Sequence, residues 1–299
     1  VLVVIEGNIV PKSGVMRVYE KISSLKEKLQ KLKQNIKSRQ KGQTFHFSPF
    51  SRKQKQVLTW WCKDSPVHDK DGIIADGAIR SGKTVSMSLS FAMWAMSTFN
   101  GQNFAMCGKT IGSFRRNVLF WLKLMLKSRG YSVIDRRADN LIIIRKGDTE
   151  NYFYIFGGKD ERSQDLIQGI TLAGVFFDEV ALIAPGGAVP ESFVNQATGR
   201  CSVEGSKFWF NCNPDGPYHW FKVNWIDKST GYLGKERVEQ IRKKAAEEGK
   251  DPGLKEILYL HFTMDDNLSL SEEIKARYRS MYIGVFFKRY ILGLWAAAE

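Results

Sequence analysis

Cysteine is scarce in this sequence, and the few cysteines it has are widely separated. None belongs to a C-x-x-C pair or lies beside a group of histidines, which excludes a zinc site and a disulfide framework and fits a reducing compartment. The four positions are Cys62, Cys107, Cys201 and Cys212.

Long apolar runs are also missing. The opening Val1 to Val4 stretch is too short for a signal peptide, and no window approaches the roughly 18 uncharged apolar residues of a membrane span. We therefore expect a soluble, cytosolic protein with no membrane partner.

Acidic residues are in the minority. The 299 residues contain 45 Lys and Arg against 31 Asp and Glu, a net charge of +14, which favours a polyanionic partner such as nucleic acid. However, residues 1–56 hold thirteen basic and three acidic residues, a net +10, which leaves +4 for the remaining 243. Most of the excess lies in an N-terminal arm, so overall charge alone does not predict a DNA-binding body.

The basic arm, residues 1–44, contains an apolar stripe at coiled-coil spacing. Because this stripe covers only two to three heptads, it predicts an amphipathic helix that either docks on another surface or self-associates. We expect residues 1–15, which precede Met16, to be either an upstream extension or a remnant added for expression. The stripe consists of Val18, Ile22, Leu25, Leu29, Leu32 and Ile36.

After residue 44, short apolar runs alternate with stretches of helical period. This alternation predicts a three-layer α/β fold with a mostly parallel central sheet, and the turn at Gly147 and Asp148 predicts a local hairpin within it. The predicted strands are 73–76, 103–107, 141–145, 152–156, 174–178, 207–211 and 257–263, and the main predicted helices are 84–96, 113–128, 236–248 and 271–281.

The first of these runs leads into a phosphate-binding motif. The apolar run 73–76 is followed by G-x-x-x-x-G-K-[ST] and then by a helical stretch, which is the context that a P-loop requires. Backbone N–H groups of the loop would bind phosphate oxygens, Lys83 would reach the β and γ phosphates, and the Thr84 hydroxyl would bind Mg²⁺. The motif comprises Gly77, Ala78, Ile79, Arg80, Ser81, Gly82, Lys83 and Thr84.

A second apolar run, 172–177, ends in two carboxylates. Asp178 is predicted to hold Mg²⁺, and Glu179 to orient and deprotonate the water that attacks the γ-phosphate. An acidic pair at this place favours hydrolysis over phosphoryl transfer to another acceptor. In the next run, 207–211, the tip carries Asn213, which either senses the γ-phosphate or belongs to an ordinary turn; spacing leaves both open.

With these elements in order, the sequence resembles the large terminase subunit of tailed double-stranded DNA bacteriophages. The resemblance covers about residues 45–299 and implies a P-loop NTPase (RecA/ASCE-like) fold, with an ATPase core over residues 45–230 and a small helical lid over 231–299. It rests further on Arg80 within the P-loop, the turn 213–217 with His219 to Phe221, the segment Asp265 to Asn267, and the ending Arg289 to Trp295.

The resemblance implies several residue roles. Arg80 would contact phosphate or sense conformation, Asn213 would couple hydrolysis to motion, and a Gln upstream of the P-loop would recognise adenine. Gln54 is the first choice and Gln56 the second, and a plain helix position is an equal alternative for either. An arginine from a neighbouring subunit would complete the site; Arg162 is the candidate, with a plain surface role as its alternative.

The resemblance also implies the biological setting. The expected function is Mg²⁺-dependent ATP hydrolysis that drives double-stranded DNA into a procapsid. The expected partners are the portal protein, the small terminase subunit and further copies in a ring. The expected location is the portal vertex in the infected host's cytoplasm, and not the mature virion. In this family, the C-terminal nuclease usually begins just after the segment matched here by residues 293–299. No nuclease activity is therefore expected from this chain.

Two other functions remain open at this point. One is a DNA-stimulated P-loop ATPase or helicase outside packaging, although no second RecA-like domain follows residue 230. The other is a nucleotide-gated assembly module with little hydrolysis of its own.

Overall fold

The computed structural model describes residues 2–5, 8–11, 21–30, 48–158, 165, 167–181 and 189–298. The chain divides into two units, residues 1–46 and 47–299. In the first unit, β1 (Leu2–Ile5) pairs with β2 (Asn8–Pro11) in antiparallel fashion, and residues 21–30 form a helix whose side chains are all exposed. The rest of the stripe predicted over Val18 to Ile36 lies outside the described residues.

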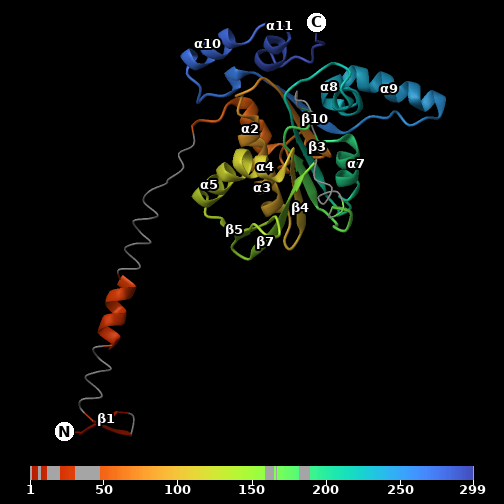
Figure 1. Cartoon of the computed structure of the whole chain (residues 1–299). Coiled ribbons are helices and arrows are strands. Elements are labelled where there is room, and N and C mark those ends of the chain that lie inside the picture. Colours follow the sequence, from red (N-terminus) through yellow and green to blue (C-terminus); the bar gives the residue numbers. More distant parts are fainter. Residues whose placement is uncertain are drawn as a thin grey trace. The chain divides into compact units, whose positions relative to one another are not determined.

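The second unit is built on an eight-stranded sheet with the order β10-β3-β9-β8-β4-β7-β6-β5 (Figure 1). Every neighbouring pair from β10 to β7 is parallel, so the carboxyl ends of these six strands share one edge. The strands are β3 (Gly72–Gly77), β4 (Asn103–Gly108), β7 (Thr149–Gly157), β8 (Gly174–Phe177), β9 (Lys207–Asn211) and β10 (Ile257–Phe262).

The remaining two strands extend the sheet in antiparallel fashion. β6 (Leu141–Lys146) turns back into β7 through Gly147, whose φ of 57° suits glycine, so the predicted hairpin is present. β5 (Ser132–Arg136) pairs with β6 and forms the sheet edge. This strand was not predicted because its short S-V-I-D-R sequence has few apolar residues, and in the structure its side chains are exposed or only half-buried.

Helices cover both faces of the sheet, which confirms the predicted three-layer architecture. On one face lie α2 (Arg52–Thr59), α3 (Lys83–Thr98) and the segment formed by α4 (Ile111–Phe114), the π-helix η1 (Arg115–Leu119) and α5 (Phe120–Ser128); on the other lies α7 (Glu191–Gly199) (Figure 1). Packed aromatic rings join α3 to the sheet, with the centroids of Trp94 and Trp209 4.7 Å apart.

The C-terminal part contributes to the same sheet. β10 pairs in parallel with the P-loop strand β3, so a boundary at 230/231 does not separate the sheet from the segment expected to be a helical lid. The other elements of this C-terminal part are α8 (Thr230–Leu233), α9 (Lys235–Glu248), η3 (Met264–Asp266), α10 (Glu272–Met281), α11 (Gly284–Phe286) and η4 (Phe287–Ile291). The π-helix η2 (Lys222–Ile226) precedes them. Among the described residues, none of the helices has both the length and the apolar character of a membrane span.

Candidate nucleotide-binding site

The P-loop fills the connection between β3 and α3, and both of its glycines have a positive φ, which favours glycine. Gly77 has φ 125°, and a Cβ placed there would lie 2.0 Å from the carbonyl oxygen of Phe262 in β10. Gly82, the N-cap of α3, has φ 82°, and a Cβ there would lie 2.3 Å from Nε2 of Gln54. The first turn of α3 has no side-chain cap from Gly82, so its N–H groups can bind a phosphate.

Lys83 is buried, and its Nζ is bound within the loop itself. It donates to the carbonyl oxygens of Gly77 and Ala78 at 3.1 and 2.6 Å, to Oγ of Ser81 at 3.1 Å and to Oδ1 of Asn213 at 3.1 Å. Burial lowers the pKa of Lys83 to about 8. Phosphate oxygens could replace these acceptors and favour the charged form of the amine.

The two predicted carboxylates follow β8 and face the P-loop. Asp178 is 5% exposed, and its Oδ1 accepts hydrogen bonds from Nδ2 of Asn211 at 2.5 Å and from Oγ1 of Thr84 at 3.4 Å. Burial, with a smaller contribution from the negative charge of Glu179, raises the pKa of Asp178 to about 7. A bound cation would favour its ionised form.

Glu179 is half-buried beside Asp178, and its backbone has φ 56°. A left-handed backbone in a glutamate costs free energy, and such conformations concentrate at functional sites. Burial raises the pKa of Glu179, and the positive charge of Lys109 partly offsets the rise. The carboxylate is thus more basic than an exposed glutamate, as a proton acceptor for water requires.

Asn211, at the end of β9, is a site residue that the sequence analysis missed. Its Nδ2 also donates to Oγ1 of Thr84 at 2.8 Å, while its buried Oδ1 has no hydrogen-bond partner among the described residues. The signal was present in the sequence, because Asn211 is the first amide at the tip of the strand whose other amide, Asn213, was selected.

The Thr84 hydroxyl and the Asp178 carboxylate lie next to one another, and both accept a hydrogen bond from Nδ2 of Asn211. Mg²⁺ beside a nucleotide needs only one or two protein carboxylates, since phosphate and water supply its other ligands. Among the described residues, no three His, Cys, Asp or Glu side chains form a metal cluster, which a nucleotide-bound Mg²⁺ does not require. The donor set therefore fits Mg²⁺, with Thr84 and Asp178 as the predicted ligands.

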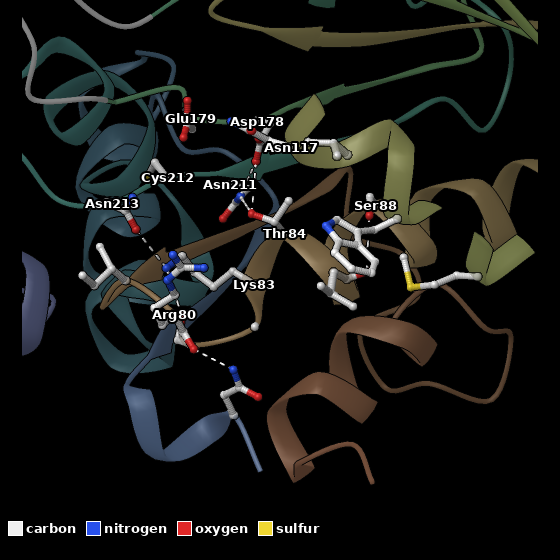
Figure 2. Close-up of a pocket in the computed structure, with 18 residues that line it drawn as sticks. Arg80, Lys83, Thr84, Ser88, Asn117, Asp178, Glu179, Asn211, Cys212 and Asn213 are labelled. Carbon is white, nitrogen blue, oxygen red and sulfur yellow. Dashed lines mark hydrogen bonds between the residues drawn. The ribbon is translucent and has the colours of Figure 1, made fainter. Parts of the chain in front are cut away.

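One cavity of about 360 Å³ is lined by the side chains described above, which are Lys83, Thr84, Asp178, Glu179, Asn211 and Asn213 (Figure 2). Figure 2 shows Thr84, Asn211 and Asp178 facing one another, with Glu179 next to Asp178 and Lys83 near Asn213. The cavity continues between α3 and α5 towards Ser88, Asn117 and Trp121, and its remaining lining residues are Ile79, Arg80, Ser81, Gly82, Val85, Val118, Met125, Cys212 and Asn267.

Arg80 is the exposed residue of the P-loop, and it has φ 58°. Its Nε donates to the hydroxyl of Tyr278 in α10 at 3.1 Å, and its carbonyl oxygen accepts from Nδ2 of Asn267 at 2.7 Å. The P-loop is therefore held by the Asp265 to Asn267 segment that the sequence analysis had singled out.

The remaining predicted residues have different placements. Gln54 is 5% exposed and next to Gly82, but its Oε1 accepts from the backbone N–H of Ser51 at 2.9 Å as part of a helix cap. Gln56 is exposed on the same helix. Arg162 lies outside the described residues.

A parallel sheet with a P-loop after β3 and an Asp-Glu pair after β8 defines a P-loop NTPase-like fold. The family profile described as "Terminase large subunit, T4likevirus-type, N-terminal" matches residues 74–299. The chain belongs to this family.

Solved structures agree with this membership. The large terminase from the thermophilic bacteriophage D6E is 62% identical, with a TM-score of 0.72 over 84% of this chain and 55% of that chain. Another structure of that protein, in complex with ATP-γ-S, is 60% identical over 84% of this chain and 54% of that chain, with a TM-score of 0.69. This chain thus spans about half the length of these relatives.

The large terminase ATPase domain of Thermus phage P74-26 is only 15% identical, over 82% of this chain and 98% of that chain. Its TM-score of 0.51 shows a common fold. No curated protein matches the sequence.

Proposed function

We propose that this chain is the ATP-hydrolysing motor domain of a terminase that moves double-stranded DNA into a procapsid. The observation that carries the proposal is the single cavity in which Lys83, Thr84, Asn211 and Asp178 meet Glu179. The D6E structures with ATP-γ-S and with ADP support nucleotide as the ligand of the corresponding fold.

Binding of ATP would replace the internal partners of Lys83. The amine, now bound to Gly77, Ala78, Ser81 and Asn213, would turn to the β and γ phosphates, and the N–H groups of the loop would hold the remaining oxygens. Thr84 and Asp178 would hold Mg²⁺, which supplies charge neutralisation to the phosphates when bound. Departure of Lys83 would also release Asn213, which makes that residue a sensor of nucleotide.

Glu179 would orient a water molecule and accept its proton as the water attacks the γ-phosphate. Arg80 would add positive charge at the phosphates, and Arg162 of a neighbouring copy remains our candidate for a residue that completes the site. Gln54 is our candidate for adenine recognition. In that role its side-chain Nε2 would stay next to Gly82 of the P-loop, while its Oε1 continues to cap α2. Within residues 231–299, the segment expected to form the lid, the part that follows β10 would act in this way, because its Tyr278 and Asn267 contact Arg80.

The proposed partners follow from the family. They are double-stranded DNA, the portal protein, the small terminase subunit and further copies of the chain in a ring at the portal vertex, in the host cytoplasm and not in the mature virion. We assign no nuclease role to residues 45–299.

The test is ATP hydrolysis measured with and without duplex DNA and portal, over a range of protein concentration. Stimulation by DNA, a steep rise with concentration and DNA movement without strand separation are expected. Strand separation in an unwinding assay would favour a helicase. Absence of hydrolysis in every assembled form would favour a nucleotide-gated assembly module and contradict the motor.

A further inference from the structure

The positive charge outside the N-terminal arm is concentrated in one part of the fold. Residues 109–150 contain ten basic and four acidic residues, a net +6, whereas the rest of residues 57–299 contains 22 basic and 24 acidic residues. The body is therefore slightly acidic except for this one segment.

The segment forms a helix-and-hairpin unit, which we define as α4, η1, α5, β5 and β6. It ends the sheet on the side opposite β10, and Figure 1 shows α5 next to β5. Because β6 runs antiparallel to β7, the β5–β6 turn lies near the sheet edge that carries the P-loop. The carbonyl oxygen of Asn140 in this turn accepts from the N–H of Ile155 at 2.8 Å, near the carboxyl end of β7.

Asp135 joins the helix to the hairpin and neutralises only part of the charge. Its carboxylate binds Nη1 of Arg115 at 2.8 Å and Nζ of Lys123 at 2.9 Å, while Nε of Arg137 lies 3.9 Å away. The Arg137 side chain is 80% exposed. One carboxylate thus interacts with three cations, and the guanidinium of Arg137 lies farthest from it.

Two more arginines flank this ion-pair cluster. Arg116 follows Arg115 in η1, Arg136 follows Asp135 in β5, and both side chains are exposed. Because successive side chains of a strand point to opposite faces, Arg136 lies on the face of β5 opposite Asp135. Among the described residues, neither Arg116 nor Arg136 forms an ion pair within 4.0 Å. Arg116, Arg136 and Arg137 therefore present positive charge to solvent around the β5 edge of the sheet.

The same unit also forms a wall of the nucleotide cavity. Asn117, adjacent to Arg116, lines the cavity, and Lys109, two residues before α4, lies close enough to Glu179 to influence its pKa. A change at the nucleotide can thus be transmitted to the basic surface through a single structural unit.

We propose that Arg116, Arg136 and Arg137 grip the phosphates of duplex DNA around this edge of the sheet. The inference rests on the proposed motor function and assigns its DNA contacts. Arginine suits this role because its charge persists at every working pH and its planar donors match phosphate oxygens. Contacts to phosphate carry no sequence preference, as movement along any genome requires.

The test compares two triple variants of the full chain, so that the basic arm is the same in both. One is R116Q/R136Q/R137Q, and the control is R237Q/K243Q/K244Q, which removes equal charge from exposed positions of α9. Affinity for a short DNA duplex is measured from 50 to 200 mM salt. We expect the first variant to bind at least about tenfold more weakly at low salt, with the salt slope reduced by roughly 2 to 3, and the control to change by less than about twofold.

Parental affinity and slope in the first variant, or equal losses in both, would overturn the proposal. R116K/R136K/R137K should retain most of the affinity, because lysine keeps the charge; a loss as large as that of the glutamine variant would equally count against a phosphate grip. ATP hydrolysis without DNA should stay at the parental rate in all variants. If the parent protein does not hydrolyse ATP, the proposed motor function is contradicted. The DNA affinities of the two triple variants would still show whether these arginines contact DNA.

Discussion

The guanidinium of Arg289 lies 2.7 Å from the carboxylate of Asp215, and this ion pair joins η4 to the loop that carries Asn213. The Arg289 side chain is 8% exposed, and its Nε also donates to the carbonyl oxygen of Ala296 at 2.8 Å. Because Asn213 accepts a hydrogen bond from Lys83, the pair connects the C-terminal segment to the P-loop lysine.

Breaking this pair should destabilise the protein and loosen the Asn213 loop. Removing one partner of a buried pair leaves the other charge uncompensated, at a cost of about 3 kcal/mol or more. We expect Arg289→Met and Asp215→Asn each to lower the free energy of unfolding in urea, and the double variant to lose clearly less than the two losses combined. Additive losses would show that the two side chains do not interact.

Asn211 should support the proposed Mg²⁺ site. Its Nδ2 holds both Asp178 and Thr84, so Asn211→Leu removes the donor that orients both side chains. Loss of such a supporting contact typically costs about 10- to 100-fold in metal affinity or activity. The Mg²⁺ concentration for half-maximal ATP hydrolysis should rise by about that factor. Ser88→Ala, elsewhere in the cavity, is the control, and an unchanged requirement in the Asn211 variant would remove Asn211 from the site.

The dependence of kcat/KM on pH should form a narrow bell, because this ratio reports ionisations of the free enzyme. Burial raises the pKa of Asp178 to about 7, so kcat/KM should fall below that pH as the carboxylate takes up a proton and loses its charge for Mg²⁺. Burial lowers the pKa of Lys83 to about 8, so kcat/KM should fall above that pH as the amine loses its charge. A profile that is flat from pH 6 to 9 would contradict these assignments.

Asp76 anchors the C-terminal segment behind the P-loop. Its fully buried carboxylate accepts from the indole N–H of Trp295 at 2.7 Å and from the hydroxyl of Tyr259 at 2.8 Å, and Nδ1 of His261 lies 3.1 Å away. Trp295→Phe and Tyr259→Phe each remove one donor to a charged group, which should cost about 1.5 to 3 kcal/mol of unfolding free energy.

The half-exposed Tyr232 supplies the control for this measurement. Tyr232→Phe removes a hydroxyl that makes only a long contact with Lys222, so its cost should be far smaller. Equal losses in all three variants would show that Asp76 is not a special anchor.

The local motifs were predictable because they depend on residues close together in sequence. Gly77 to Thr84 fix their own loop, and Asp178 and Glu179 end a buried strand, so the sequence was enough to place both on one sheet edge. The mostly parallel sheet followed from the alternation of strands and helices, and it is confirmed.

Long-range contacts were not predictable. Three of these contacts join residues that are 74 to 219 positions apart, and no local pattern encodes them. They are the pairing of β10 with β3, the contact of Asp76 with Trp295, and the ion pair of Asp215 with Arg289. Asn211 was missed for a related reason: its role depends on the two side chains that β8 and the P-loop bring to it.

The most direct test of the account is to measure ATP binding and ATP hydrolysis together on Glu179→Gln, with Lys83→Ala alongside. Glutamine keeps the shape of Glu179 but cannot accept a proton from water. The account therefore predicts ATP binding close to that of the parent with hydrolysis lowered by at least about 100-fold, the lower end of what a positioned base contributes. Lys83→Ala should lose both. Near-normal hydrolysis by Glu179→Gln would contradict the assignment of this cavity as the catalytic site.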